Sequence, residues 1–404
     1  MDIASLNTGS QFGNWFRDPV FTEMRQLLES LRAPLSLMEL FGGLSTGHIA
    51  IAALGCLPDL KLYCDVNADL IHWISQLHTI ASEIHCGAIS GDILLKDVKS
   101  LPRVMIIIAG PPCPPWSSKG ARKSWEDSRS VPFWRTLDII VDQARSGSSL
   151  IVVLENVLGF ASKQSNGTVP LDEVLQLLFE ELPSDWTIDY FIYNTKDFGL
   201  AHNRPRVYVT GRKTLGGALR SFPAKVQCFK RKPNVCEFAR RQLPQEIEAL
   251  VPGYRGRSYS PLQRSNLRQW RNALSSELNG VSFRGQCIFF AYDRSPSSRT
   301  SWKPNMSYET CECLTATGPV LHCFSLGDNA KSRDSSVLPS ERAALQGFPL
   351  DYIVDDHRSQ EACKAIGNAM SVPVLAVALF RELFYQLKTR PQLFSSASAS
   401  LPRN

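Results

Sequence analysis

Between residues 36 and 211 the chain alternates short apolar runs of strand character with stretches whose apolar residues recur at helical spacing. Such alternation predicts a doubly wound α/β sheet. The expected strands are 36–41, 60–66, 85–89, 104–109, 150–154, 186–193 and 206–210. Helical patterns cover 133–145, 171–182, 340–346 and 369–387. Ligands of such sheets bind beyond the carboxyl ends of the strands, so we expect the chemistry in the loops that follow them.

A proline-rich segment, GPPCPPWSSKG at residues 110–120, follows the isoleucine-rich run 104–109. That run is typical of a strand buried on both faces. The four prolines of the segment 110–120 forbid both helix and strand pairing, which predicts a rigid loop at the carboxyl end of the strand. The loop presents Cys113 as a candidate nucleophile. A structural turn around a buried thiol is the alternative interpretation.

A glycine-rich turn, MELFGGLSTG at residues 38–47, follows the first expected strand. Its glycines let the backbone approach a ligand closely. The next strand ends at Asp65, whose carboxylate can accept from both hydroxyls of a ribose, and Asp92 follows the third strand. These features together predict an adenosine-binding site. The turn lacks the Gly-x-Gly-x-x-Gly pattern and a Walker lysine, which disfavours a dinucleotide or a triphosphate.

Charged residues stand at two further strand ends. Glu155, in LENVLGF, closes the run 150–154, where a carboxylate is costly unless it has a partner or a function. The residues alone leave open which of the two applies. Arg204 and Arg206, in FGLAHNRPRVYVTG, precede the last expected strand. Arginines two apart on an extended chain point the same way and could clamp a carboxylate, a phosphate or a base edge.

The cysteine count and the hydropathy of the 404-residue chain indicate the cellular compartment in which it resides. Its 11 cysteines are an odd number without paired spacing, which favours reduced thiols in a reducing compartment. No apolar run approaches the roughly 18–20 residues of a membrane span, and the N-terminus does not resemble a signal peptide. We therefore expect an intracellular protein without a membrane partner. The one compact group, Cys311, Cys313, His322 and Cys323, lacks the usual spacing of zinc ligands, so no metal site is expected.

The formal net charge of +6 is unevenly distributed. Residues 212–310 hold 18 Lys and Arg against 6 Asp and Glu, a balance of +12, which leaves −6 for the remainder. Pro, Gly, Ser and Tyr stand between the arginines of this basic segment. The pattern favours a nucleic-acid contact surface over a merely solvated face. The candidate contacts are Arg255, Arg257, Arg268 and Arg271.

Taken in chain order, these motifs resemble those of the cytosine-5 DNA methyltransferase family. The matching series is FGGLSTG, Asp65 and Asp92, GPPCPPWS, ENV, NRPRVYV, ERAALQGFP at 341–349 and GNAMSVPV at 367–374. The resemblance covers most of residues 35–385 and implies a Rossmann-like methyltransferase sheet with a smaller, basic target-recognition domain. The implied parts are an N-terminal extension over 1–34, a catalytic domain over 35–211 completed by 340–388, a target-recognition domain over 212–310 and a disordered tail over 391–404.

The resemblance also implies a reaction, the transfer of a methyl group from S-adenosylmethionine to carbon 5 of a cytosine flipped out of DNA. It implies that Cys113 adds to carbon 6 of the ring, that Glu155 contacts the ring, and that Arg204 or Arg206 favours the thiolate. The implied cofactor contacts are Phe41, Gly42, Gly43, Asp65, Asp92, Pro111 and Asn368. The implied location is the nucleus of a eukaryote or the cytoplasm of a bacterium.

Several residues depart from the family's usual motifs. Glu39 replaces an aspartate, and Ser45 and Thr46 stand where two glycines are usual. Pro114 and His202 occupy positions where glutamine is usual. The nucleophile, the carboxylate and both arginines are retained, so we expect an active enzyme. Two alternatives stay open: the tRNA-methylating branch of the family, and a catalytically silent nucleic-acid-binding homologue.

Overall fold

The computed structural model describes residues 34–80, 86–117, 123–198, 200, 202–215, 261, 265, 268–269, 287–291, 306–308, 311, 313–315, 321–325, 333–337, 339–348, 352 and 359–394. The chain folds into two compact units. The first unit comprises Met1–Tyr193, Pro205–Val226 and Met370–Asn404, and the second comprises Asn194–Arg204 and Gln227–Ala369. The domain boundaries inferred from the sequence stay a prediction.

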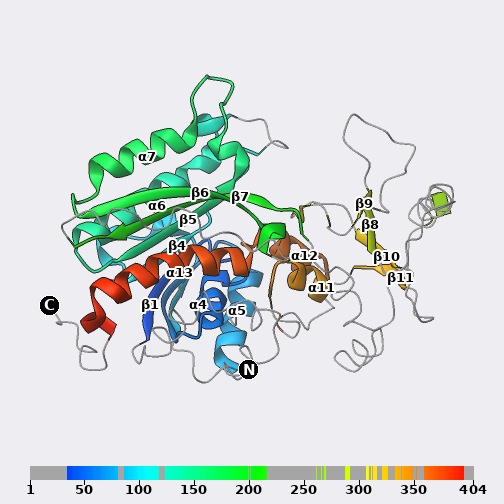
Figure 1. Ribbon diagram of the computed structural model, residues 1–404, viewed down its shortest axis with the longest axis horizontal. Helices are drawn as coiled ribbons and strands as arrows, with labels where there is room; N and C mark the ends of the chain where they lie inside the picture. The colour runs from blue at the N-terminus through cyan, green and yellow to red at the C-terminus, as the bar shows by residue number, and fades with distance from the viewer. Residues whose placement is uncertain are drawn as a thin grey trace. The chain divides into compact units, whose positions relative to one another are not determined.

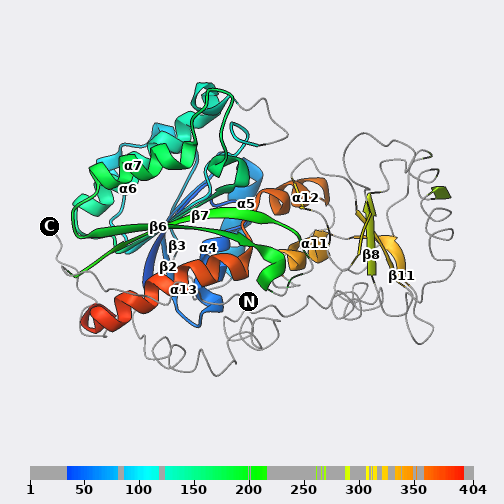
Figure 2. The same ribbon diagram turned by 45° about the horizontal axis from the view of Figure 1, so that its top comes forward.

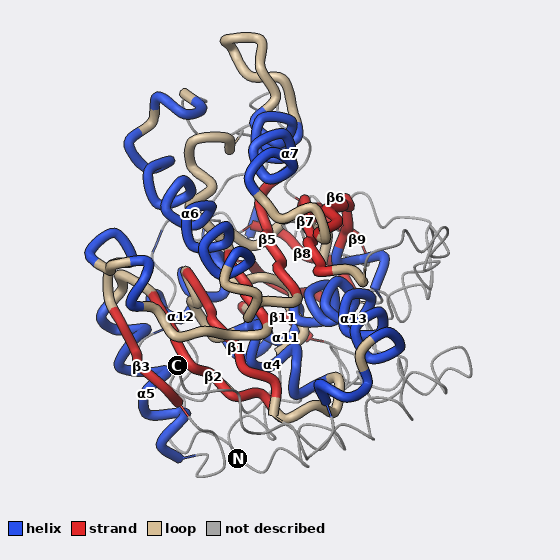
Figure 3. Tube along the Cα trace, turned by 90° about the vertical axis from the view of Figure 1, so that its left-hand side faces the viewer, coloured by secondary structure: helices blue, strands red, loops and turns tan. Residues whose placement is uncertain are grey.

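The first unit is built on a seven-stranded sheet of order β3-β2-β1-β4-β5-β7-β6 (Figure 1). Its strands are β1 (Leu35–Leu40), β2 (Pro58–Cys64), β3 (Cys86–Ser90), β4 (Ile106–Ala109), β5 (Ile151–Val157), β6 (Trp186–Asn194) and β7 (Pro205–Lys213). Strands β1 to β5 pair in parallel, and β7 pairs antiparallel to β5. Figure 3 shows β1, β2 and β3 side by side. The predicted α/β sheet is thus confirmed.

Continuous apolar runs explain the centre of this sheet. Every residue of β1 and β4 is buried, as is β5 up to Asn156, which is the pattern of strands covered on both faces. The edge strand β6 instead alternates between half-buried and exposed residues near its end. The hydrophobic core is therefore centred on β1, β4 and β5, and the loops that follow these strands are attached to the most buried part of the sheet.

Helices cover both faces of the sheet. In Figures 1 and 2, α6 and α7 lie on one face, and α4 and α13 lie on the other. The helices of this unit are α4 (Thr46–Ala53), α5 (Ala68–Ile80), α6 (Val131–Arg145), α7 (Pro170–Glu181) and α13 (Val372–Thr389). Short 3₁₀ turns are η2 (Ile93–Leu95), η3 (Val98–Ser100), η4 (Ser124–Glu126), η5 (Ser128–Ser130), η6 (Leu158–Ala161) and η9 (Pro391–Phe394). Proline in the first turn fixes where α6, α7 and α13 begin.

The second unit contains an antiparallel sheet of order β11-β10-β8-β9 among its described residues. The strands are β8 (Cys287–Ala291), β9 (Met306–Tyr308), β10 (Leu321–Ser325) and β11 (Arg333–Ser336). The helical elements are η7 (Thr195–Phe198), α11 (Pro339–Leu345) and α12 (Ser359–Asn368). Most of the basic segment 212–310, and residues 395–404 of the expected tail, lie outside the described residues.

One helical stretch is long and apolar enough to cross a membrane by length and composition alone, which the sequence reading did not anticipate. This stretch, Glu361–Thr389, has 83% of its most apolar window buried inside the protein. Within it, α13 packs against α4, β5 and β7. Such burial is what the core helix of a globular unit shows, so the stretch is weak evidence for a membrane span.

Candidate active site

Three of the predicted site elements sit at neighbouring carboxyl strand ends of the first unit. The glycine-rich turn follows β1, the Cys113 loop follows β4, and Glu155 lies near the end of β5. Because β1, β4 and β5 are adjacent and parallel, these elements meet at one edge of the sheet. This edge is the candidate active site.

The Cys113 loop is held by its own backbone and by a neighbouring strand. The carbonyl of Cys113 accepts from the backbone N–H groups of Trp116 and Ser117 at 3.1 and 3.0 Å. The Asn156 amide, on β5, donates to the carbonyl of Pro111 at 3.3 Å. The side chain of Cys113 is half-buried. The loop is therefore rigid, as its prolines predicted, and leaves the thiol partly accessible.

An aromatic cluster anchors the far end of the same loop. Trp116 is fully buried, and its ring packs edge-on against Trp125, Phe133 and Phe160 with centroid separations of 5.1–5.3 Å. Gly159 passes so close that a Cβ there would lie 1.8 Å from the Trp116 carbonyl oxygen. The loop that carries Cys113 is thus held by the aromatic contacts of Trp116 and by the close approach of Gly159 in η6.

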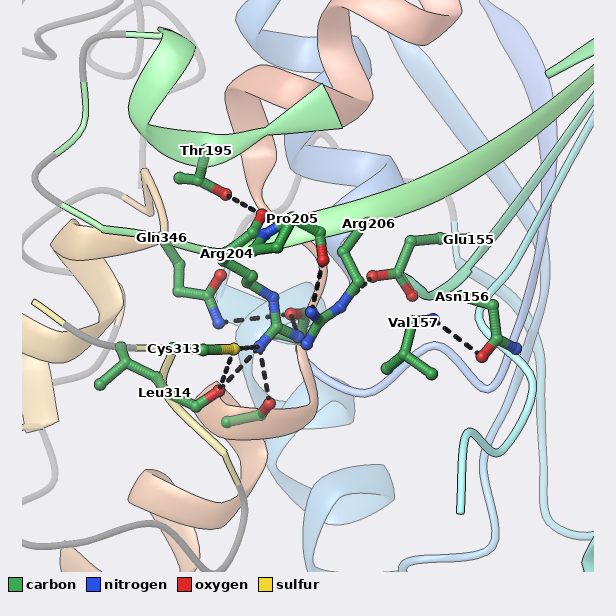
Figure 4. A network of polar contacts seen from close by, with 12 residues as sticks. Glu155, Asn156, Val157, Thr195, Arg204, Pro205, Arg206, Cys313, Leu314 and Gln346 are labelled. Carbon is green, nitrogen blue, oxygen red and sulfur yellow. Dashed lines mark hydrogen bonds and ion pairs between the residues drawn. The ribbon is translucent and has the colours of Figure 1, made fainter. Parts of the chain in front are cut away.

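Glu155 forms a buried ion pair with Arg206. The Arg206 Nε lies 3.0 Å from Glu155 Oε1, and both side chains are largely excluded from solvent (Figure 4). The Glu155 carboxylate also flanks the start of the nucleophile loop, because a Cβ at Gly110 would lie 3.8 Å from its Oε2. A buried carboxylate is costly without a cation, and Arg206 supplies one. The carboxylate is therefore held in a fixed place beside the loop.

The glycine-rich turn after β1 adopts three left-handed residues, Phe41, Gly43 and Ser45, with φ of 57°, 53° and 53°. Asp65, beyond the end of β2, accepts from the Gly43 N–H at 3.0 Å. The buried Tyr63 donates its hydroxyl to the Gly43 carbonyl at 2.6 Å. The N–H and the carbonyl of one residue, Gly43, therefore tie the turn to Asp65 and to Tyr63 of β2.

Glu39 supports this turn from inside the sheet. Its carboxylate is buried and accepts from the Ser45 hydroxyl and from the Gly47 N–H, each at 2.5 Å. Desolvation raises the pKa of Glu39 to about 7, against the lowering effect of the hydrogen bonds from Ser45, Gly47 and His48. The glutamate that departs from the family pattern is thus a buried structural acid under the turn.

Arg204 has different partners, all in the second unit. Its guanidinium is buried and donates to the carbonyls of Leu314, Gly367 and Ala369 at 2.7, 3.2 and 2.8 Å (Figure 4). Nearby, the His202 imidazole accepts from the Leu314 N–H at 3.0 Å. Arg204 thus joins segments more than 100 residues apart. Its predicted catalytic role stays a prediction.

A family model for the C-5 cytosine-specific DNA methylase matches residues 35–384. The chain belongs to this family. The match spans every motif discussed above, from the turn after β1 to α13.

Curated relatives agree with this family. The Type II methyltransferase M.HpaII of Haemophilus parainfluenzae is 26% identical over 86% of this chain and 88% of its own length. The Type II methyltransferase M.SsoII of Shigella sonnei is 26% identical over 70% of this chain. The chain spans 65% of M.SsoII and 33% of the orphan methyltransferase M.Rho11sI of Bacillus phage rho11s.

Two solved structures share the fold. The Entamoeba histolytica methyltransferase EhMeth covers 88% of this chain with 99% of its own, at 16% identity and a TM-score of 0.52. A mutant of Spodoptera frugiperda DNMT2 covers 87% of this chain with 99% of its own, at 15% identity and a TM-score of 0.52. At these identities the likeness concerns the fold alone.

The remaining predicted cofactor contacts of this methylase-family chain are placed as follows. Asp92 begins η2, where its carboxylate accepts from the Leu94 N–H at 2.9 Å. Pro111 is buried at the start of the Cys113 loop. Asn368 is exposed at the end of α12 and belongs to the second unit, so its approach to the turn after β1 stays a prediction.

Of the four predicted nucleic-acid contacts, only Arg268 lies among the described residues, and its side chain is exposed. Arg255, Arg257 and Arg271 lie outside them. The described part of the chain holds no group of three or more His, Cys, Asp or Glu side chains placed to bind a metal ion.

Sequence reasoning did not single out Arg129, a cation whose charge interacts with that of Cys113. Arg129 binds Asp127 through two bonds, Nε to Oδ1 at 2.8 Å and Nη2 to Oδ2 at 2.6 Å. These bonds raise the pKa of Arg129, with a further contribution from the charge of Cys113, and lower the pKa of Asp127 to about 2. Arg129 therefore lies within electrostatic reach of Cys113. The triplet Asp-Ser-Arg soon after the proline-rich loop was the available signal.

Proposed function

We propose that this chain is a DNA (cytosine-5) methyltransferase that moves a methyl group from S-adenosylmethionine to carbon 5 of a flipped-out cytosine through a covalent Cys113 adduct. The observation that carries the proposal is the pairing of a rigidly held, half-buried cysteine with a buried carboxylate on the adjacent strand. Membership of the C-5 cytosine methylase family supports it.

The proposed reaction needs each of these groups. Carbon 5 of cytosine is a poor nucleophile until the Cys113 thiolate adds to carbon 6 and breaks the conjugation of the ring. The Glu155 carboxyl group, fixed by Arg206, contacts the ring nitrogen and supports its protonation as the adduct forms. Once carbon 5 carries the methyl group, with S-adenosylhomocysteine as the leaving group, a base removes the carbon-5 proton. The electron pair of that C–H bond re-forms the double bond between carbons 5 and 6, and the Cys113 thiolate leaves carbon 6.

Cations near the thiol favour its reactive form. An unperturbed cysteine has a pKa near 8.5, so few such thiols are ionised at neutral pH. Arg129 is one such cation, since the charge of Cys113 contributes to the raised pKa of its guanidinium. Asp127 holds this guanidinium in one orientation through two bonds. We therefore add Arg129 to the residues that support the nucleophile.

The residues at the ends of β1, β2 and β3 fit S-adenosylmethionine, which when bound would supply the electrophilic methyl group. A Cβ at Gly91 would meet no atom within 4 Å, and one at Gly43 would meet only a carbonyl oxygen at 3.9 Å, so this edge has open space. Each Asp65 oxygen accepts one backbone N–H, from Gly43 and from Asn67, which leaves lone pairs for ribose hydroxyls. We propose that Asp65 and Asp92 hold the adenosine part.

A covalent trap tests the proposal. DNA that carries 5-fluorocytosine should form a stable adduct with the wild-type protein in the presence of S-adenosylmethionine, because fluorine cannot leave as a proton does. Cys113→Ser should abolish the adduct and methyl transfer while cofactor binding persists. Cys363→Ser, which alters another half-buried thiol, is the matched control and should still form the adduct. An adduct in Cys113→Ser would show that another residue is the nucleophile.

Transfer of a tritium label separates the alternatives. Label found in duplex DNA supports the proposal, and label found only in tRNA would identify the tRNA-methylating branch. Cofactor binding or nucleic-acid binding without any transfer would identify a silent homologue.

Salt dependence tests the basic segment. If Arg268 and Arg271 contact phosphates, neutralising both should weaken binding to every duplex and lower the salt slope by about one unit per lost contact. Lys61→Gln, which removes an exposed cation from β2, is the control and should leave the slope unchanged. An unchanged slope in the double variant would remove these two arginines from the contact surface.

A further inference from the structure

Of the three departures of the turn after β1 from the family's pattern, Glu39, Ser45 and Thr46, the first two touch each other. Glu39 stands where aspartate is usual, Ser45 stands where glycine is usual, and the Ser45 hydroxyl donates to the Glu39 carboxylate at 2.5 Å. Both side chains are buried. The two departures therefore form one interaction.

Steric and conformational demands differ among the small residues of this turn. A Cβ at Gly47 would lie 2.6 Å from Ile108 Cδ1 and 2.7 Å from Glu39 Oε1, so a larger residue there would have to displace these two side chains. Position 45 demands instead a left-handed backbone, with φ 53° and ψ 48°. A residue with a Cβ takes that conformation at a free-energy cost that glycine avoids. Serine at 45 therefore needs a compensating interaction.

Glu39 supplies that interaction and also begins the helix. Ser45 is the N-cap of α4, yet its hydroxyl makes no cap hydrogen bond to the helix. The Glu39 carboxylate accepts from the Gly47 N–H at 2.5 Å and is also hydrogen-bonded by the His48 backbone. One carboxylate thus satisfies helix N–H groups and holds the Ser45 hydroxyl. Aspartate is one methylene shorter, so its carboxylate would withdraw from these donors.

We infer that Glu39 and Ser45 are a mutually compensating pair of positioning residues that fixes the turn on which the cofactor is bound, an inference that rests on the proposed function for its ligand. Neither side chain is placed to contact the cofactor itself. They act through the backbone of residues 41–47, which Tyr63 and Asp65 tie to β2. The serine does not abolish the turn because the glutamate accompanies it.

A comparison of two single variants with their double variant tests the inference. Glu39→Asp alone leaves the left-handed serine without its partner and should weaken binding of S-adenosylhomocysteine, used as the probe, by roughly tenfold in isothermal titration. Ser45→Gly alone also breaks the pair but relieves the left-handed strain, so it should weaken binding by less than Glu39→Asp does. The double variant Glu39→Asp/Ser45→Gly restores the family's usual combination and should bind within about threefold of the wild type. Ser45→Ala keeps the left-handed strain and loses the hydroxyl. It should therefore bind S-adenosylhomocysteine more weakly than Ser45→Gly does.

Amide hydrogen exchange of the unliganded protein gives a readout that needs no cofactor. Residues 41–48 should lose protection in each single variant and regain it in the double variant, while α6 and α7 should exchange as in the wild type. Two single effects that simply add in the double variant, in both measurements, would overturn the inference. A wild type that binds no S-adenosylhomocysteine would refute the proposed cofactor, and the exchange pattern would still decide whether the pair exists.

Discussion

A buried acid on α13 should contribute far more to stability than an exposed acid that shares its cations. Glu382 is fully buried and accepts from the Thr210 hydroxyl at 2.9 Å and from Arg212 Nη1 at 3.0 Å. Asp189, on β6, is 37% exposed and binds Arg381 at 2.6 Å and Arg212 at 3.5 Å. The network joins α13 to the β7–β6 edge of the sheet, so it tests how the C-terminal helix is held.

The magnitudes follow from burial. Glu382→Gln keeps the shape but replaces two hydrogen bonds to a carboxylate by weaker neutral ones and leaves Arg212, whose side chain is 11% exposed, short of a buried counter-charge. Breaking a buried pair costs about 3–5 kcal/mol. Because Arg212 retains Asp189, we expect a loss of about 2–3 kcal/mol of unfolding free energy. Asp189→Asn should cost about 1 kcal/mol or less, because solvent screens its pairs.

Urea unfolding followed by tryptophan fluorescence at 25 °C measures both variants. Repeating it in 1 M NaCl should remove most of the Asp189→Asn effect and little of the Glu382→Gln effect, because buried pairs are poorly screened. An Asp189→Asn loss as large as that of Glu382→Gln, or equal salt sensitivity in the two variants, would refute the assignment of the stability to the buried acid.

Three further perturbations follow from the geometry. The pKa of Glu39 is raised from an ordinary 4.5 to about 7, so the folded state binds this proton more tightly than the unfolded state does. The unfolding free energy of the wild type, measured relative to that of Glu39→Gln by urea unfolding, should therefore fall by roughly 3 kcal/mol as the pH rises from 4 to 8. Gly159→Ala should displace the Trp116 backbone and cost more than about 2 kcal/mol, whereas Gly91→Ala, which meets open space, should be neutral in thermal unfolding. Arg204→Lys loses the planar fork whose two terminal nitrogens donate to three carbonyls, so it should lower the melting temperature, as measured by calorimetry.

Most strands could be read from the sequence because their burial is two-sided. The expected strand 36–41 is β1 at Leu35–Leu40, and 104–109 contains β4 at Ile106–Ala109. The strand expected to end at residue 154 instead continues to Val157 as β5. Its polar extension is stable because Glu155 stands opposite Tyr208 of β7 in the strand pairing and its carboxylate binds Arg206. A partner 50 residues away along the chain leaves no local pattern to read.

The same limit applies to the site. The loop of Cys113 followed from its prolines, and the position of Glu155 near a strand end followed from the apolar run before it, both of which are local signals. The two arginines of NRPRV looked equivalent in the sequence, yet Arg206 binds a carboxylate whereas Arg204 binds backbone carbonyls. Which residue each guanidinium meets depends on segments brought together by the fold, and a spacing of two residues does not encode it.

The Cys113 loop and the turn after β1 are each held by a buried side chain that would not touch a substrate. Trp116 anchors the Cys113 loop in the aromatic cluster, and Glu39 anchors the turn after β1. A loop fixed in this way loses little conformational entropy when a ligand binds, so the support contributes directly to affinity and to the orientation of the reacting atoms. We therefore expect a substitution at either support to lower kcat/KM by as much as removal of a ligand-contacting residue, although neither support lies within the reaction itself.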